Sequence, residues 1–161
     1  MGRLAGAVVL AVFIPASAMA ATVSALEALG SDEKVSMDAL KASIDNLEQL
    51  VLFDARDLKS YNEKHIRGAV LPMPEEYYRL QELFRAQVIG ISPDADIALA
   101  EGMKEYPKDA LIVVYCNDNC ALAEHLSLKL KDLGFARVHV LDGGIQSWEK
   151  KGYPVETNSG L

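Results

Sequence analysis

The chain has 161 residues, of which 50% are hydrophobic and 24% are charged, and its formal net charge is −7. This length and composition are typical of one globular domain with a substantial core. The acidic balance and the lack of clustered Lys and Arg exclude nucleic acid as a partner.

The N-terminus has the pattern of a signal peptide over residues 1–20. Arg3 supplies a basic start, residues 4–14 are apolar, and residues 18–20 read Ala-Met-Ala, a small-x-small cleavage site. The apolar stretch is shorter than the roughly 20 residues of a transmembrane helix. We therefore expect export to the periplasm or another compartment outside the cytoplasm, with membrane contact only through this segment if it stays uncleaved. The alternative is a buried first helix or an uncleaved anchor.

Small residues predominate over 21–31 and predict a linker. The folded domain is expected at residues 32–156, followed by a short tail at residues 157–161. Neither internal repeats nor low-complexity tracts interrupt it.

The domain begins with an amphipathic pattern. Leu40, Ile44 and Leu47 recur at helical spacing, which predicts a helix over residues 37–50 with Ser36 as its cap. A short buried strand follows at residues 51–53.

Shorter elements come next. Residues 58–64 are expected to form a helical turn, and residues 69–71 a second short strand, which the prolines after it stop. Helical spacing then predicts helices over residues 75–88 and 94–106.

The last third of the chain has the clearest pattern. Residues 111–115 are wholly apolar and predict a buried strand, and residues 122–133 predict a helix that Gly134 ends. A final strand is expected at residues 137–141 and a helix at residues 145–151. Short apolar strands that alternate with helices indicate an α/β domain with a mostly parallel sheet.

Both cysteines lie in one loop, between the predicted strand at residues 111–115 and the helix that follows. Cys116 ends the strand, and Cys120 stands four positions later. A loop that opens a helix points backbone N–H groups into a common hollow, where the helix dipole favours negative charge. Because such a site favours thiolate, Cys116 is a candidate nucleophile. The alternative is a buried structural thiol.

Several segments, taken in order, resemble the rhodanese family of sulfurtransferase domains. They are Phe53-Asp54-Ala55-Arg56, His65-Ile66-Arg67-Gly68-Ala69, Val113-Val114-Tyr115-Cys116, Leu141-Asp142-Gly143-Gly144 with Trp148, and Gly152-Tyr153-Pro154-Val155. Together they cover about residues 35–156. The chain is most similar to exported, single-domain members with a Cys-x3-Cys loop. The resemblance implies a three-layer sandwich, with a central, mostly parallel five-stranded sheet between helices on both faces.

The resemblance also implies a reaction. The Cys116 thiolate would take the outer sulfur of a donor, such as thiosulfate or another sulfane or persulfide, and pass it to a thiol acceptor, either a small molecule or a protein. Backbone N–H groups of the loop would hold the anionic end of the donor. That loop consists of Asn117, Asp118, Asn119, Cys120 and Ala121. No metal or organic cofactor is implied.

Three further residues of the matching segments are expected to support the site. Asp54 and Arg56 would tie the end of the first strand to its neighbouring loops, and His65 would hydrogen-bond backbone near the first loop. A catalytic role is the alternative for each, although an Arg does not deprotonate in proteins.

The loop departs from the usual pattern of the family. It has no Arg, Lys or Gly, and Asp118 is expected to raise the pKa of Cys116. Thiosulfate is therefore not expected to be the best donor. The loop is also one residue longer, as in phosphatases of this fold, but those need an Arg where this chain has Leu122. Phosphatase activity is not expected.

Cys120 has three possible roles. It resolves a Cys116 persulfide by forming a Cys116–Cys120 bond, it is a structural disulfide partner, or it faces the helix core. Two other functions remain open beside sulfur transfer: a thiol–disulfide redox protein that uses both cysteines, and a non-catalytic binding module that keeps the fold.

Overall fold

The structure is a computed structural model that describes residues 26, 29–30, 34–84 and 93–158. The predicted signal peptide at residues 1–20 and most of the predicted linker lie outside the described residues. Among the helices within these ranges, none has the length and apolar character needed to cross a membrane.

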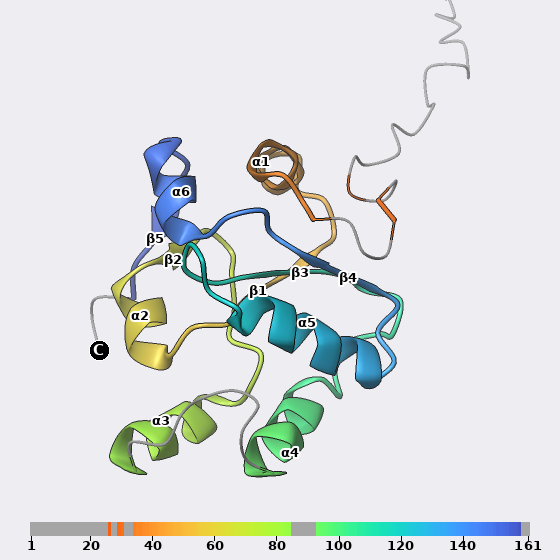
Figure 1. The fold of residues 1–161 in the computed structure, drawn as a ribbon, viewed down its shortest axis with the longest axis vertical. Coiled ribbons are helices and arrows are strands. Elements are labelled where there is room, and N and C mark those ends of the chain that lie inside the picture. Colours follow the sequence, from red (N-terminus) through yellow and green to blue (C-terminus); the bar gives the residue numbers. More distant parts are fainter. Residues whose placement is uncertain (1–25, 27–28, 31–33, 85–92, 159–161) are drawn as a thin grey trace, which may run out of the picture.

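A parallel sheet forms the centre of the domain (Figure 1). Its strands, in spatial order, are β1 (Val51–Asp54), β3 (Leu111–Tyr115) and β4 (Arg137–Val140). Single parallel bridges extend the sheet at both edges, where Val70 pairs with Phe53 and Val35 pairs with Leu141. Five chain segments therefore run side by side, which confirms the expected α/β fold.

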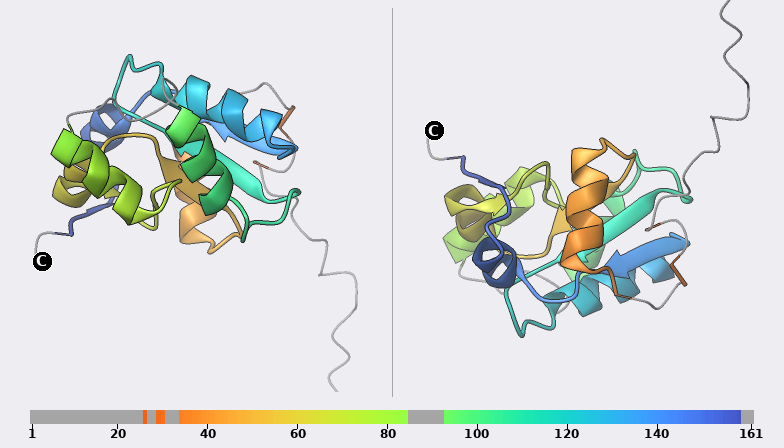
Figure 2. Two further views of the ribbon diagram at one scale, coloured as in Figure 1. Left: turned by 90° about the horizontal axis from the view of Figure 1, so that it is seen from below. Right: turned by 90° about the horizontal axis from the view of Figure 1, so that it is seen from above.

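Helices cover both faces of this sheet. They are α1 (Met37–Asp45), α2 (Leu58–Glu63), α3 (Glu75–Phe84), α4 (Pro93–Gly102), α5 (Leu122–Asp132) and α6 (Ile145–Lys150). In Figure 2, α3, α4 and α5 lie on one face, and α1 and α6 lie on the other. The result is the three-layer arrangement that the resemblance implied.

β3 is apolar throughout because it is buried on both faces. Ile112 and Val114 pack in the cluster on the α5 side, together with Cys116. Val113 and Tyr115 pack in the other cluster, with α1 and α6. The alternation of side chains along the strand thus directs Cys116 toward α5 and Tyr115 toward the opposite layer.

Some elements differ from the sequence predictions. The first helix ends at Asp45 rather than at residue 50, because Leu47 takes a left-handed conformation (φ +54°) and the N–H of Glu48 turns back to the carbonyl of Ser43. The strand expected at residues 69–71 is reduced to the single bridge at Val70.

Two short strands were not predicted. β2 (His65–Ile66) and β5 (Val155–Glu156) pair in an antiparallel ladder beside the main sheet. The helix predicted over residues 75–88 reaches Phe84, and the rest of that prediction lies outside the described residues.

Candidate active site

β3 delivers Cys116 to the carboxyl end of the parallel sheet, where α/β domains place their ligands. The backbone carbonyl of Cys116 accepts a hydrogen bond of 3.0 Å from the N–H of Ile145, the first residue of α6. Only 2% of Cys116 is exposed. The end of the strand is therefore fixed from both sides, by the core and by α6.

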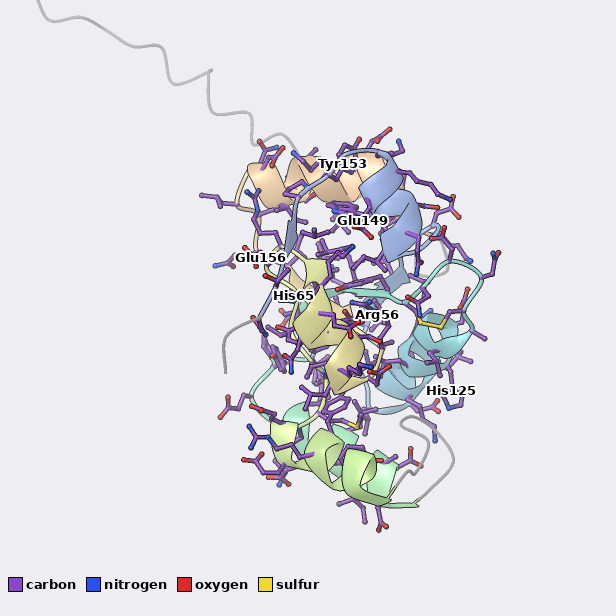
Figure 3. The ribbon with its side chains drawn as sticks, turned by 90° about the vertical axis from the view of Figure 1, so that its left-hand side faces the viewer. Arg56, His65, His125, Glu149, Tyr153 and Glu156 are labelled. Atoms are coloured by element: carbon purple, nitrogen blue, oxygen red, sulfur yellow. A yellow bond between two sulfur atoms is a disulfide. The ribbon has the colours of Figure 1, made fainter. Side chains whose placement is uncertain are left out.

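Cys116 and Cys120 form a disulfide, with their Cα atoms 6.1 Å apart. Asn119 adopts a left-handed conformation (φ +57°), which Asn tolerates better than most residues, and this lets the loop turn back on itself. The N–H of Leu122 donates to Sγ of Cys120 at 3.4 Å, so the second sulfur lies at the start of α5. Figure 3 shows the disulfide beside this helix. Of the three roles considered for Cys120, the two that pair it with Cys116 remain.

Asp118 points away from the disulfide and binds the start of α6. Its Oδ1 accepts hydrogen bonds from the N–H groups of Gly144 (2.8 Å) and Ser147 (3.1 Å), and its Oδ2 accepts one from the Ser147 hydroxyl (2.6 Å). The Ser147 side chain, followed by these backbone N–H groups, lowers the pKa of Asp118. The loop carboxylate therefore serves as a cap for α6, which its position in the sequence did not indicate.

Gln146 fastens the same loop from the other direction. Its Nε2 donates to Oδ1 of Asn117 at 2.8 Å, and its Oε1 accepts from the N–H of Asp118 at 2.7 Å. The expectation that every N–H of the loop faces a substrate is thus wrong for Asp118, because a side chain of α6 already occupies that N–H.

Gly144 allows this close approach. A Cβ atom at that position would lie 2.2 Å from both the carbonyl carbon of Asn117 and the nitrogen of Asp118. The Gly-Gly pair after β4 was predicted to form a tight turn. The structure adds that its second glycine leaves room for the cysteine loop.

A cavity of about 460 Å³ opens beside the disulfide and is bordered by both cysteines. Of the predicted loop residues, Asn117, Asn119 and Ala121 also line it, whereas Asp118 does not. Its ionisable wall residues are Lys34, Glu124 and Asp142. The structure thus brings most of the predicted loop together around one hollow.

Lys34 is the cation of this cavity, and no local pattern in the sequence could have found it. Its Nζ lies 3.0 Å from Oε1 of Glu124 on α5, and this hydrogen bond lowers the pKa of Glu124. Lys34 reaches the cavity because Val35 adds a parallel bridge next to β4. Tertiary structure therefore supplies a charge that the loop lacks.

Asp54 and Arg56 form a buried ion pair at the end of β1. Nε of Arg56 lies 2.9 Å from Oδ1 of Asp54, and an Nη lies 2.6 Å from Oδ2. Burial lowers the pKa of Arg56, but hydrogen bonds and charge from Asp54 outweigh it and leave that pKa raised. The Tyr115 hydroxyl donates to the same Oδ2 and accepts from the N–H of Ile66 at 3.1 Å. This network lies under the strand end that carries Cys116.

His65 belongs to a separate part of the domain and does not line the cavity. Its Nδ1 lies 2.9 Å from the carbonyl oxygen of Tyr61, its ring stacks on the Tyr61 ring at 4.1 Å, and its Nε2 lies 3.8 Å from Glu156. Figure 3 shows Arg56, His65 and Glu156 around α2. Within the described ranges, no group of three or more His, Cys, Asp or Glu side chains is arranged to hold a metal ion.

Comparison with known proteins supplies the family context. A sequence model of the rhodanese-like domain matches residues 36–151. The chain is also 30% identical over 115 residues to the "Probable adenylyltransferase/sulfurtransferase MoeZ" of Mycobacterium tuberculosis. That alignment covers 71% of this chain but only 24% of the relative, so the chain spans about a quarter of that protein.

Solved structures share the fold. The BH2092 protein of Bacillus halodurans is 28% identical, with a TM-score of 0.58, and the match covers 80% of this chain and 78% of that one. The rhodanese-like domain of the Anabaena protein Alr3790 is 23% identical, with a TM-score of 0.58 and 80% of each chain covered. Thiosulfate sulfurtransferase from Pseudomonas aeruginosa is 24% identical, with a TM-score of 0.55, over 77% of this chain and 20% of that one.

Proposed function

Because the chain belongs to the rhodanese-like domain family, we propose that it is an exported sulfurtransferase that carries sulfur on Cys116. The observation that carries this proposal is the position of Cys116, which directly follows β3 and borders a cavity of about 460 Å³ at the carboxyl end of the sheet. The relative named as a sulfurtransferase and the thiosulfate sulfurtransferase neighbour support the same type of reaction.

The first step requires the reduced protein. The Cys116 thiolate attacks the outer sulfur of a sulfane donor, the sulfur–sulfur bond of the donor breaks, and its remainder leaves with the electron pair. With thiosulfate the leaving group is sulfite. The product is a persulfide on Cys116.

The second step has two routes. An external thiolate attacks the outer sulfur and takes it as a new persulfide, which returns Cys116 as thiolate. Alternatively, the Cys120 thiolate attacks Sγ of Cys116, expels hydrosulfide and forms the disulfide. The observed Cys116–Cys120 bond supports the second route, which needs two electrons from a thiol reductant before the next cycle.

The charges of the cavity bear on the donor. Lys34 is already paired with Glu124, and Asp142 adds a further carboxylate. A dianion such as thiosulfate therefore gains little electrostatic attraction, so a persulfide of lower charge is the better donor.

Export and the domain limits are part of the proposal. The signal pattern at residues 1–20 supports secretion, and a disulfide persists outside the reducing cytoplasm. The mature protein then begins with the linker at residues 21–31 and continues into the domain at residues 32–156, with residues 157–161 as its tail. Sequencing the N-terminus of the exported protein tests this, and the expected first residue is Ala21.

The disulfide also favours a second candidate function, thiol–disulfide exchange with an exported partner. In that case Cys116 and Cys120 would cycle between dithiol and disulfide without carrying sulfur. A binding module without catalysis would require neither reaction.

Mass spectrometry of the intact protein separates these functions. The chain is reduced, freed of reductant and mixed with thiosulfate, polysulfide or mercaptopyruvate. The Cys120→Ser variant should gain and keep one sulfur on Cys116, whereas the wild type should release sulfide and return to the disulfide. Cys116→Ser should gain none, and equal sulfur uptake by that variant would overturn the proposal. If neither the wild type nor Cys120→Ser takes up sulfur, and the wild type only forms its disulfide, the second candidate function would be established.

A further inference from the structure

The two sulfur atoms of the disulfide are not equally open to an incoming thiol. Cys116 is 2% exposed and packs in the core cluster on the α5 side. Cys120 is half-buried, packs against that cluster from outside it and stands just before α5. Since thiol–disulfide exchange depends on access to the attacked sulfur, the geometry favours attack on Cys120.

Attack at Cys120 has a defined chemical outcome. The thiolate of the reductant bonds to Sγ of Cys120, the Cys116–Cys120 bond breaks, and its electron pair leaves on Cys116 as thiolate. A second thiol then attacks the mixed disulfide and releases Cys120, so two thiols are oxidised for each disulfide reduced. The residue that must carry sulfur is freed in the first step.

The charged side chains that line the cavity determine which reductants it attracts or repels. Three ionisable side chains line the cavity, one cationic (Lys34) and two acidic (Glu124 and Asp142), so their formal charge is −1. Lys34 is held 3.0 Å from Glu124. Asp142 also borders a neighbouring hollow with Lys150 and Lys151, but Lys151 is bound to Asp38. The side-chain charges that line the cavity therefore disfavour a reductant with an extra negative charge.

We propose that the Cys116–Cys120 disulfide is reduced through Cys120 by a thiol whose other groups are neutral or cationic, and that the carboxylates Glu124 and Asp142, only one of which Lys34 balances, set this preference. The inference rests on the proposed function for its purpose, because sulfur transfer needs free Cys116. The reduction itself is measured without any sulfur donor. Failure of one proposal therefore does not imply failure of the other.

The ion pair allows variants with opposite effects. Glu124→Gln removes a carboxylate and leaves Lys34 without its partner, so anionic thiols should be less disfavoured. Lys34→Met leaves Glu124 unpaired, so anionic thiols should be more disfavoured. Glu101→Gln is the matched control, because Glu101 forms an ion pair with Lys104 that does not line the cavity.

The test compares rates of disulfide reduction in the oxidised full chain. The reductants are cysteamine, 2-mercaptoethanol and 3-mercaptopropionate, with rates expressed per thiolate and corrected for thiol basicity. We expect a roughly fivefold decrease in rate for each added negative charge, the effect of a unit charge about 4 Å away in water-like surroundings. High salt should reduce the decrease. Glu124→Gln should diminish it, Lys34→Met should enlarge it, and Glu101→Gln should reproduce the wild type.

The attacked sulfur is identified by quenching the reaction with an alkylating agent and mapping the peptides. The expected intermediate carries the small thiol on Cys120 and the alkyl group on Cys116. The reverse assignment would overturn attack at Cys120. An equal decrease in rate per added negative charge in wild type, Glu124→Gln and Lys34→Met would overturn the charge selection.

Discussion

Tyr115 directly precedes Cys116 in the chain, and its hydroxyl donates a hydrogen bond of 2.6 Å to Oδ2 of Asp54. Both residues are fully buried, and Asp54 also holds Arg56. Burial, followed by the negative charge of Asp54, raises the pKa of Tyr115, so the hydroxyl keeps its proton and remains a donor. The end of β3 thus rests on a hydrogen-bonded carboxylate on the face opposite the disulfide.

Tyr115→Phe should lower the free energy of unfolding by about 1–3 kcal/mol, because Asp54 loses a donor and the buried N–H of Ile66 loses its acceptor. Urea unfolding measures the difference. Tyr106→Phe is the control, since it keeps the edge-to-face ring contact with Phe53. Equal stability of Tyr115→Phe and wild type would contradict the importance of this bond.

Asp118→Asn should destabilise the protein near neutral pH by about 1 kcal/mol, the usual value of a helix cap. The pKa of Asp118 lies below its ordinary value of 3.8 in the folded state. Its contribution is therefore fully present above the unfolded value and is lost as the pH falls through the folded one.

Denaturation curves for wild type and Asp118→Asn should accordingly differ at about pH 7 and converge as the pH falls through the folded-state pKa of Asp118. Asp132→Asn, an exposed residue at the end of α5, provides the control. A difference between wild type and Asp118→Asn that does not change with pH would show that the carboxylate charge has no part in the cap.

Gly144→Ala should displace the cysteine loop, because the added Cβ meets the backbone of Asn117 and Asp118 at 2.2 Å. We expect a loss of stability of about 1–3 kcal/mol and slower re-formation of the Cys116–Cys120 bond after reduction. Gly102→Ala is a matched control, since its Cβ would meet the carbonyl oxygen of Pro72 at 2.5 Å, away from the loop. Both variants should be less stable, but only Gly144→Ala should change the rate at which the disulfide re-forms.

Reduction of the disulfide should lower the free energy of unfolding by roughly 2 kcal/mol. The reason is that so short a covalent loop restricts the conformational entropy of the unfolded chain by about this much free energy. Urea unfolding of the oxidised and reduced protein measures the change. The free energy of unfolding of the double variant Cys116→Ser/Cys120→Ser should not change when reductant is added. A reduced wild type as stable as the oxidised protein would mean that the bond adds nothing to the fold.

The sequence predicts elements best where apolar runs and caps agree. The bounds of β3 match the prediction, since residues 111–115 are apolar throughout. α5 ends within one residue of the prediction because Gly134 takes a positive φ there. β2 and β5 were missed, since two residues carry no detectable period. The end of α1 was predicted too late, because the left-handed position that ends a helix usually holds glycine and here holds Leu47.

Only those residues of the site that lie close together in the sequence could be predicted. Cys116, Cys120 and their loop were predicted as the candidate site from the strand–loop–helix pattern. The binding of Asp118 to α6 and the arrival of Lys34 depend on contacts between distant segments, which the residue pattern does not encode. For the same reason, the role of Asp118 as a cap for α6 was not predicted.

The attachment of the cysteine loop to α6 also decides what can be exchanged between related domains. Asn117 and Asp118 are satisfied by Gln146, Ser147 and the N–H of Gly144. A loop transplanted from another domain would leave these partners unmatched unless α6 came with it. The transferable unit is therefore a pair of segments, residues 116–121 and 144–147. Chimaeras that exchange the loop alone would lack the hydrogen bonds between these two segments.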